Sequence, residues 1–223
     1  MAKLVWDQVG QKLYETGVAQ GVLYTITEGA YSKGVAWNGL SKVSESPSGA
    51  ESSPVYADNQ QYLNLISAEK YSATIEAYIF PEEFMECDGS KSVAKGVYVG
   101  QQTRKTFGFS YKTLIGNDAN STDYGYKIHL VYGAVASPCQ KEYGTVSDTP
   151  EAISFSWEIS TTPVEVPGSK PSATIVIDST KTTTEKLAAL EKILYGTNAD
   201  GSTTAVEPRM PLPSEIITLM AEG

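Results

Sequence analysis

The chain has 223 residues, enough for one domain with additions or two small domains, and 17 Lys and Arg against 26 Asp and Glu give a net charge of −9. An acidic chain repels phosphate backbones, which argues against a tight DNA- or RNA-binding protein. One histidine, two cysteines and the absence of a long apolar run exclude most zinc sites, most histidine-dependent catalysis and a membrane span.

The N-terminal half reads as strands around one long polar loop. Residues 21–27 are rich in β-branched and aromatic side chains and predict the first strand. Residues 41–59, rich in Ser, Glu and Pro, predict a loop; loops of this length tend to be functional or disordered, so we interpret it as a contact arm. Residues 68–80 alternate as a strand, and a short helix over 81–86 follows.

Further strands are predicted over residues 96–101, 104–114, 124–136, 152–160 and 174–178. Polar residues 116–123 predict a turn between the second and third of these. The alternation in 124–136 places Tyr126, Ile128, Leu130 and Tyr132 opposite Lys127, His129 and Val131. The alternation in 152–160 places Ile153, Phe155, Trp157 and Ile159 inward and Ser154, Ser156, Glu158 and Ser160 outward.

The C-terminal region changes to a helical period. Thr182 and Glu185 form a capping-box pattern, a stripe of Leu187, Leu190 and Leu194 follows, and Gly196 indicates the end of the helix. Residues 197–207 predict a flexible stretch. The apolar residues 216–220 are expected to dock on this subunit or on a neighbour.

These seven or eight strands predict a mainly β fold, an antiparallel β-sandwich or barrel with a short flanking helix, a long loop, and a C-terminal helix plus an extended arm. Residues 1–180 are expected to form the β-sandwich, with loop 41–59 as its contact arm. Residues 181–223 are expected to form the C-terminal helix and a docking extension.

We predict no catalytic, cofactor-binding or metal-ligating residue, no cofactor and no enzymatic activity. His129 lies inside a predicted strand without a Ser, Cys or metal-ligand partner nearby, so a structural role is favoured. Four acidic residues could be read as a glycosidase pair, but helix-terminus electrostatics explains them more simply. They are Glu82, Glu83, Glu86 and Asp88.

Two other polar groups are weak site candidates. Residues 117–123 are rich in oxygen ligands, but no Gly and no terminal Glu stand at the positions that an EF-hand requires, so a turn is favoured over a calcium site. One group of basic residues is a weak nucleic-acid site, and acid–base contact between subunits explains it at least as well. Its members are Lys91, Lys95, Arg104, Lys105 and Lys112.

The start of the chain does not resemble a secretory signal, which places the protein in a cytoplasm at first. Free thiols are therefore favoured over a disulfide for Cys87 and Cys139. A low content of charged residues, 19%, suits a surface that other protein covers, and suits an ordinary β-rich surface equally well.

An ordered set of short motifs resembles the major tail proteins, or tail tube proteins, of long-tailed phages and prophages of Gram-positive bacteria. The resemblance covers nearly the whole chain, and the set is specific although no single motif is. The motifs are AWNGL at 36–40, PSGAE at 47–51, YADN at 56–59, IEAY at 75–78, PEEF at 81–84, CDG at 87–89, FGFSY at 107–111, LIGND at 114–118, GYKIHLVY at 125–132, FSWEISTTPV at 155–164 and PRMPLP at 208–213.

The resemblance implies a structural virion protein whose subunits form six-membered rings that stack into a tube. One sheet of each subunit would line the lumen as a continuous barrel, through which double-stranded DNA passes without specific binding. The implied partners are further copies of the chain and the tape measure, tail terminator and distal tail proteins, with no membrane. The implied location is the virion tail, assembled in the host bacterial cytoplasm.

Two hypotheses follow from the charge and the long loop. An acidic lumen would repel DNA so that the duplex slides without sticking, and loop 41–59 would contact neighbouring subunits. The alternative class is a secreted β-sandwich adhesin or carbohydrate-binding module, which exposed Tyr and Trp would serve but which the start of the chain disfavours.

Overall fold

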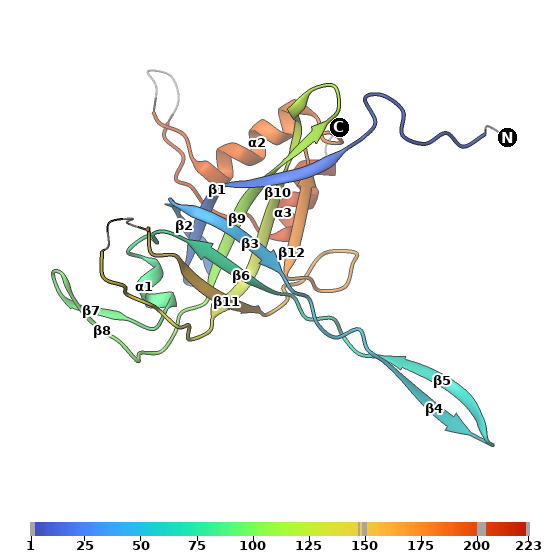
Figure 1. Ribbon diagram of the computed structural model, residues 1–223, viewed down its shortest axis with the longest axis horizontal. Helices are drawn as coiled ribbons and strands as arrows, with labels where there is room; N and C mark the ends of the chain where they lie inside the picture. Colours follow the sequence, from blue (N-terminus) through green and yellow to red (C-terminus); the bar gives the residue numbers. More distant parts are fainter. Residues whose placement is uncertain (1–2, 147, 149–150, 200–203, 222–223) are drawn as a thin grey trace.

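Strands dominate the chain, as its Tyr, Val, Ile and Thr content leads one to expect. The computed structural model describes residues 3–146, 148, 151–199 and 204–221, which form an antiparallel β-sandwich with flanking helices (Figure 1). The predicted mainly β, antiparallel fold class is confirmed. The strands are β1 Tyr14–Thr27, β2 Ala30–Trp37, β3 Leu40–Glu45, β4 Ser52–Ala57, β5 Gln60–Ile66, β6 Ser72–Ala77, β7 Lys91–Ala94, β8 Val97–Val99, β9 Phe107–Asn117, β10 Ser121–Ala136, β11 Phe155–Thr161 and β12 Thr174–Asp178. The helices are α1 Phe84–Cys87, α2 Thr184–Tyr195 and α3 Pro213–Ala221.

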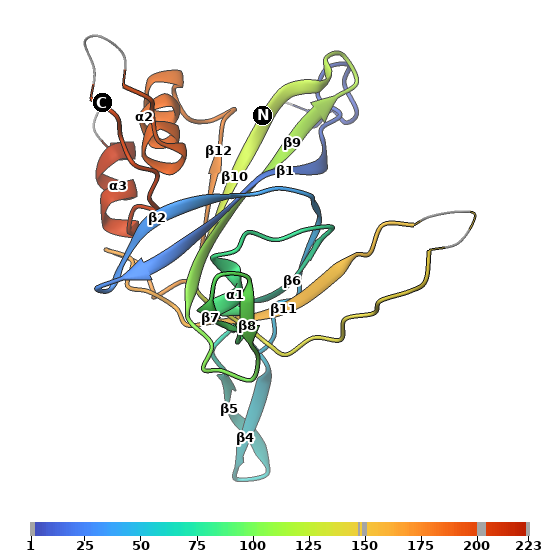
Figure 2. The same ribbon diagram turned by 90° about the vertical axis from the view of Figure 1, so that its left-hand side faces the viewer.

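One curved sheet has the strand order β2-β1-β9-β10-β11-β6-β3, and β12 also pairs with β10. The long strand β10 serves both halves: its first part pairs with β9 and β12, and its end, Ala134–Ala136, pairs with β11. Gly133 lies between the two parts with a φ of +60°. The sheet therefore folds over, and β11, β6 and β3 lie across from β1 and β9 (Figure 2).

Two apolar cores lie on opposite faces of β1, β9 and β10. The first fills the interior of the sandwich, where Trp37 packs against Phe84, Phe109 and Trp157. The second lies under α2, α3 and β12 and includes the residues Tyr24, Ile128, Leu130, Tyr132, Leu190 and Ile216. The predicted alternation of β10 is confirmed, because Ile128, Leu130 and Tyr132 face the helices whereas Val131 faces the interior.

The predicted loop 41–59 is wrong. Residues 40–45 form β3, and residues 52–66 form a hairpin of β4 and β5. The turns explain the error, because Gly39, Asp58 and Asn59 have positive φ, which Gly, Asn and Asp adopt at little cost in tight hairpins. For the same reason β1 is longer than the predicted strand 21–27, and β2 was missed beyond the turn at Glu28 and Gly29.

The other predicted strands in the middle of the chain are present, but they begin and end at other residues than predicted. Predicted strand 68–80 is β6, 96–101 is β8 with an unforeseen partner β7, 104–114 is β9, and 152–160 is β11. Residues 174–178 form β12 as predicted, and the short helix begins at Phe84 rather than at 81. In the region of β11, Trp157 and Ile159 point inward as predicted, but Ile153 precedes the strand and is exposed.

The C-terminal helix has the predicted leucine stripe and ends at Gly196, but its N-cap is Thr183 and no side chain caps it. The capping-box prediction is wrong because this shift places Glu185 one position too early for the box. Within the stretch 197–207 that was predicted to be flexible, Thr197 and Val206 form an isolated bridge, and residues 200–203 lie outside the described part.

The C-terminal extension docks on its own subunit. The backbone of residues 208–210 runs along the outer edge of β2, with Gly34 donating to the Pro208 carbonyl at 2.7 Å and Met210 donating to the Tyr31 carbonyl at 3.1 Å. The apolar end then forms α3, whose Ile216 is buried in the second core. Regions 1–180 and 181–223 therefore share this core.

Gly133 gives a sharp test of the fold, because the sandwich bends there. A Cβ atom at this position would lie 2.3 Å from the Thr162 carbonyl oxygen, in a backbone conformation that L residues avoid. We expect Gly133→Ala to lower the free energy of unfolding by about 3 kcal/mol or more, measured by urea denaturation. Gly144→Ala is the control, since open space surrounds Gly144, and it should change by less than about 0.5 kcal/mol. Equal midpoints would show that the bend does not need glycine.

Candidate functional site

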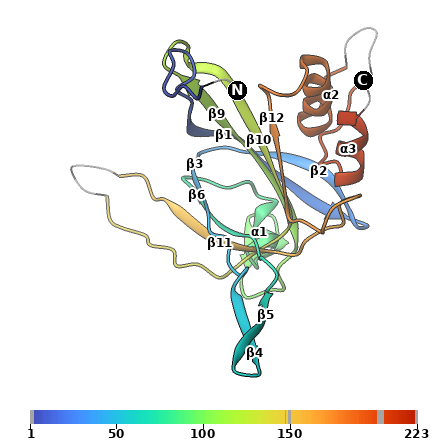
Figure 3. The same ribbon diagram turned by 90° about the vertical axis from the view of Figure 1, so that its right-hand side faces the viewer.

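The hairpin of β4 and β5, residues 52–66, projects away from the sandwich (Figures 1 and 3). Each of its residues is exposed, and Asp58 is its one charged residue. Six large apolar side chains are exposed by 38 to 72%. They are Val55, Tyr56, Tyr62, Leu63, Leu65 and Ile66. Isolated two-stranded hairpins are marginally stable in water, so this element is suited to burial against another surface.

A second surface, which we term the polar face, is the outward side of β11, β6 and β3. The strands place their outward side chains in register, in rows that join Ser156 to Glu76 and Glu158 to Thr74. Lys42 on β3 forms an ion pair with Glu76 at 3.3 Å. The inward residues of the same strands, among them Ile75 and Trp157, belong to the first core. The polar face consists of Lys42, Ser44, Ser72, Thr74, Glu76, Ser156, Glu158 and Ser160.

The N-terminal segment, residues 3–13, is a third exposed surface. Leu4, Val5 and Trp6 are exposed by 63 to 74%. The base of the segment is attached to the β9–β10 turn, because Gly10 donates to Asp118 Oδ1 at 2.9 Å and Asn117 Nδ2 donates to the Gly10 carbonyl at 3.1 Å. The segment is thus attached at one end and leaves its apolar side chains in solvent.

The acidic residues near α1 are bound to groups of the same subunit. Glu83 pairs with Lys33 at 2.9 Å and Glu86 with Lys105 at 2.5 Å. Asp88 binds both Arg104 and Lys141, and Glu82 accepts a hydrogen bond from Tyr98. Glu82, Glu83 and Glu86 line a cavity of about 410 Å³ between α1 and the ends of β1 and β2. Pairing of this kind within the subunit accounts for the acidic group near α1 by contacts with Lys33, Lys105, Arg104, Lys141 and Tyr98.

The predicted basic group is divided by the fold. Arg104 and Lys105 bind the acidic residues near α1, whereas Lys112 on β9 binds Glu191 on α2 at 2.9 Å and lies 4.0 Å from the Tyr126 ring. Lys91 and Lys95 lie on or beside β7, away from Lys112. The five residues therefore do not form one basic patch. The acid–base contacts of this group were expected between subunits. Arg104, Lys105 and Lys112 instead pair with acidic residues of their own subunit.

The oxygen-rich turn at 116–123 uses its oxygens in hydrogen bonds. Asn117 Oδ1 accepts from the backbone of Ala119 and Asn120, and Asp118 Oδ1 accepts from Gly10. This local bonding is that of an Asx turn, in line with the turn interpretation. In the described part of the chain, no group of three or more His, Cys, Asp and Glu residues is arranged to hold a metal ion.

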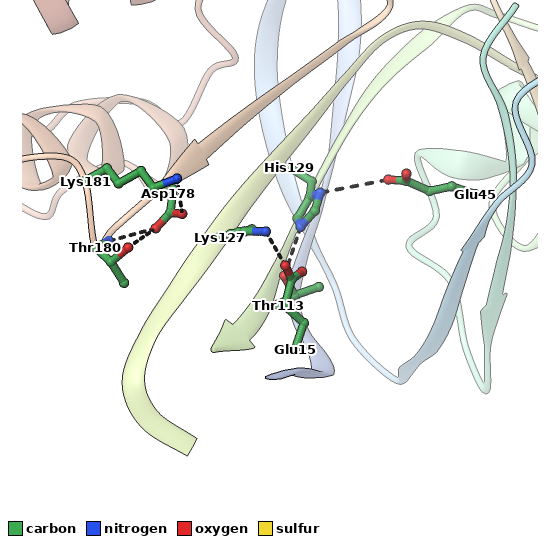
Figure 4. A network of polar contacts seen from close by, with 8 residues as sticks. All are labelled: Glu15, Glu45, Thr113, Lys127, His129, Asp178, Thr180 and Lys181. Carbon is green, nitrogen blue, oxygen red and sulfur yellow. Dashed lines mark hydrogen bonds and ion pairs between the residues drawn. The ribbon is translucent and has the colours of Figure 1, made fainter. Parts of the chain in front are cut away.

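His129 lies in a polar cluster inside the sandwich (Figure 4). Its ring stacks on Tyr111 with centroids 4.5 Å apart, and its Nε2 atom lies 2.9 Å from Thr113 Oγ1. Tyr111 donates to Glu45 Oε1 at 2.6 Å, and His129 Nδ1 lies 3.9 Å from that oxygen. The cluster thus joins β3 to β9 and β10 across the interior.

Both cysteines are free, as predicted, and burial raises the pKa of the Cys87 thiol to about 12.

The cluster predicts a pH dependence of stability. Burial lowers the pKa of His129 below its usual 6.5, which outweighs the attraction of Glu45 and Glu15 for the charged form, and Lys127 acts in the same direction as burial. The unfolded chain therefore binds a proton that the folded chain refuses, so stability falls as the pH drops below 6.5, by up to about 1.4 kcal/mol per pH unit.

His129→Gln keeps a hydrogen-bonding group near Thr113 but does not titrate. We expect its unfolding free energy to fall less steeply than that of the wild type between about pH 6.5 and pH 5. Urea denaturation of both proteins across this range measures the difference between their unfolding free energies. The contributions of all other titrating groups are the same in both proteins and cancel in that difference. Parallel curves would show that His129 is protonated equally in the folded and unfolded states.

Among the described residues, no helix is both long enough and apolar enough to cross a membrane. Comparison of the sequence with models of known protein families finds no matching family, and comparison with curated proteins finds no matching relative. Function therefore has to be inferred from the three exposed surfaces: the hairpin, the polar face and the N-terminal segment.

Proposed function

We propose that this chain is a structural virion protein that polymerises as stacked hexameric rings into the tail tube of a long-tailed phage, the conduit for DNA during ejection. The observation that carries the proposal is the hairpin of β4 and β5. A chain that folds as a monomer gains nothing from projecting six exposed apolar side chains on a marginally stable element, whereas a self-assembling subunit buries them against its neighbours.

The free edge of β3 supports ring formation. The other end of the strand order, β2, is covered by residues 208–210, but within the described residues no strand pairs with the outer edge of β3. Ser46 donates to the Ser72 carbonyl, so the alternation of an antiparallel ladder turns the backbone groups of Val43 and Glu45 outward. A neighbouring subunit that pairs there would extend the sheet, and closure into a ring removes such edges.

The polar face supports a lining for DNA. Its hydroxyl groups are hydrated. Its two glutamates outnumber its one lysine, so the face carries a small net negative charge, which repels DNA phosphates weakly. In this proposal β11, β6 and β3 line the lumen. Besides further copies of the chain, the proposed partners are the tape measure, tail terminator and distal tail proteins, and the proposed location is the virion tail after assembly in the host cytoplasm.

Negative-stain electron microscopy of the purified protein tests the proposal. Rings or tubes, formed across a series of protein concentrations, are the expected result. Protein that stays monomeric at all concentrations and salt conditions would contradict it, and would favour the alternative of a carbohydrate-binding module or adhesin that uses the exposed Tyr56 and Tyr62.

A further inference from the structure

We infer that the N-terminal segment of one copy adds to the hairpin of a second copy as a third strand, along the outer edge of β5. The inference rests on the proposed self-assembly and names the occupant of the hairpin. Its basis is the backbone of the hairpin, the composition of the segment, and the position of the two elements on the molecule.

The two outer edges of the hairpin differ. Ser67 donates to the Glu51 carbonyl at 3.0 Å, and from this pair the ladder alternates, so Ser53 and Leu65 bond to each other and Pro54 and Asn64 turn their backbone groups outward. Proline has no N–H, which protects the β4 edge from further pairing. The β5 edge presents the N–H and carbonyl groups of Asn64 and Ile66 and has no such protection.

The N-terminal segment has the properties of an added strand. Residues 3–7 make no backbone hydrogen bond to the described part of the chain, so their donors and acceptors are available. Leu4, Val5 and Trp6 are apolar and exposed, and an extended chain would place Leu4 and Trp6 on one face. The segment 3–13 carries Lys3, Lys12 and Asp7, a net +1, whereas residues 51–66 carry Glu51 and Asp58, a net −2. The charges are therefore complementary.

The two elements lie on opposite sides of the sandwich in the vertical direction of Figures 1 to 3, and both extend to the right in Figure 1. In all three views the hairpin projects at the bottom and the N-terminal segment lies at the top, beside the β9–β10 turn to which Gly10 is bound (Figures 1 to 3). The segment thus lies apart from the hairpin of its own subunit. A contact between the two elements joins copies head to tail, and such a contact repeats from copy to copy. A three-stranded unit with an apolar face is also far more stable than a two-stranded hairpin.

Site-specific photo-crosslinking tests the contact in the full-length protein. A benzophenone amino acid replaces Trp6, the assembled protein is irradiated, and the covalent dimers are mapped by mass spectrometry. We expect cross-links to residues 60–66 of another copy. The control places the same probe at Tyr143, an equally exposed residue in a distant loop, and should give none in that range. Cross-links from position 6 to any other region, or no dimers in assembled protein, would overturn the inference.

A matched pair of variants tests the backbone edge. Asn64→Ala loses the side-chain bond from Ser52 but keeps the outward N–H, whereas Asn64→Pro also removes the N–H, at a position whose cross-strand partner is already Pro54. We expect the proline variant to give about tenfold less cross-linked dimer than the alanine variant, as the loss of one edge hydrogen bond implies. Equal yields would contradict pairing at β5.

Microscopy of the same samples separates the two ideas. Tubes whose position-6 cross-links lie outside the hairpin would overturn the inference and leave the proposed function standing. Cross-links to residues 60–66 in oligomers that are neither rings nor tubes would support the strand contact and count against the tail tube.

Discussion

Replacing residues 49–69 with an Asn-Gly turn is expected to abolish tube formation while the sandwich remains folded. Ser48 and Lys70 exchange two backbone hydrogen bonds, of 2.9 and 2.7 Å, at the base of the removed segment. Paired residues of this kind lie about 5.5 Å apart, a gap that a two-residue type I′ turn closes. The deletion therefore removes the six exposed apolar side chains of the hairpin without breaking the pairing of β3 with β6.

Sedimentation and electron microscopy measure the loss of tubes, and thermal unfolding checks the fold. The hairpin contributes no residue to either apolar core, so the unfolding temperature should change by no more than about 4 °C. The control is the single variant Asn59→Gly, which keeps the charge of Asp58 and the positive φ angles of the hairpin turn and should assemble like the wild type. Tubes formed by the deletion variant would remove the hairpin from the assembly mechanism.

The sequence predicted the type of element well where an alternating pattern met a core. In β11 the side chains of Trp157 and Ile159 are buried, and in β10 the predicted faces separate into the two cores, because burial on one face decides the register of a strand. Element ends and partners depend on pairing across the sheet, which a single chain pattern does not contain. β7 and β8 pair only with each other and bury little, so their pattern is correspondingly weak.

The largest error is the prediction of a loop at 41–59, where β3 and the hairpin of β4 and β5 lie, although the turn residues of the sequence indicate these strands. Asn38-Gly39 is the strongest short-range signal for a hairpin, and Asp58-Asn59 joins two residues that tolerate positive φ between alternating apolar residues. Both faces of the hairpin carry a mixture of polar and apolar side chains, because neither face packs against a core of this subunit. Patterns that assume a core therefore describe it poorly, which is why the candidate assembly surface was expected as a loop.

The polar groups show a similar limit. The isolated position of His129 in a strand suggested a structural role, but its partners Glu45, Tyr111 and Thr113 come from other strands, and only the folded sheet brings them together. The basic group between Lys91 and Lys112 was expected to contact acidic residues of neighbouring subunits, yet Arg104 and Lys105 form ion pairs within the chain. The surplus of negative charge has to be assigned to particular faces before it bears on DNA.

Reversing the charge of the polar face should convert a surface that DNA passes into one that holds it. Glu76→Lys with Glu158→Lys places two new cations beside Lys42 in each subunit, and a ring multiplies them. We expect tubes of this variant to bind short duplex DNA about 100-fold more tightly than wild-type tubes at low salt, with the logarithm of the affinity falling more steeply as salt increases. Co-sedimentation of labelled duplex with tubes over a salt series measures both quantities.

The control separates the face from the net charge. Glu28→Lys with Glu165→Lys changes the charge of the chain by the same amount, but Glu28 lies in the β1–β2 turn and Glu165 follows β11, outside the polar face. Phosphate contacts add up only where several cations lie within reach of one duplex, so the scattered pair should bind far less DNA than the clustered pair. Equal binding by both variants would mean that overall charge governs DNA passage, and it would remove the reason for assigning β11, β6 and β3 to the lumen.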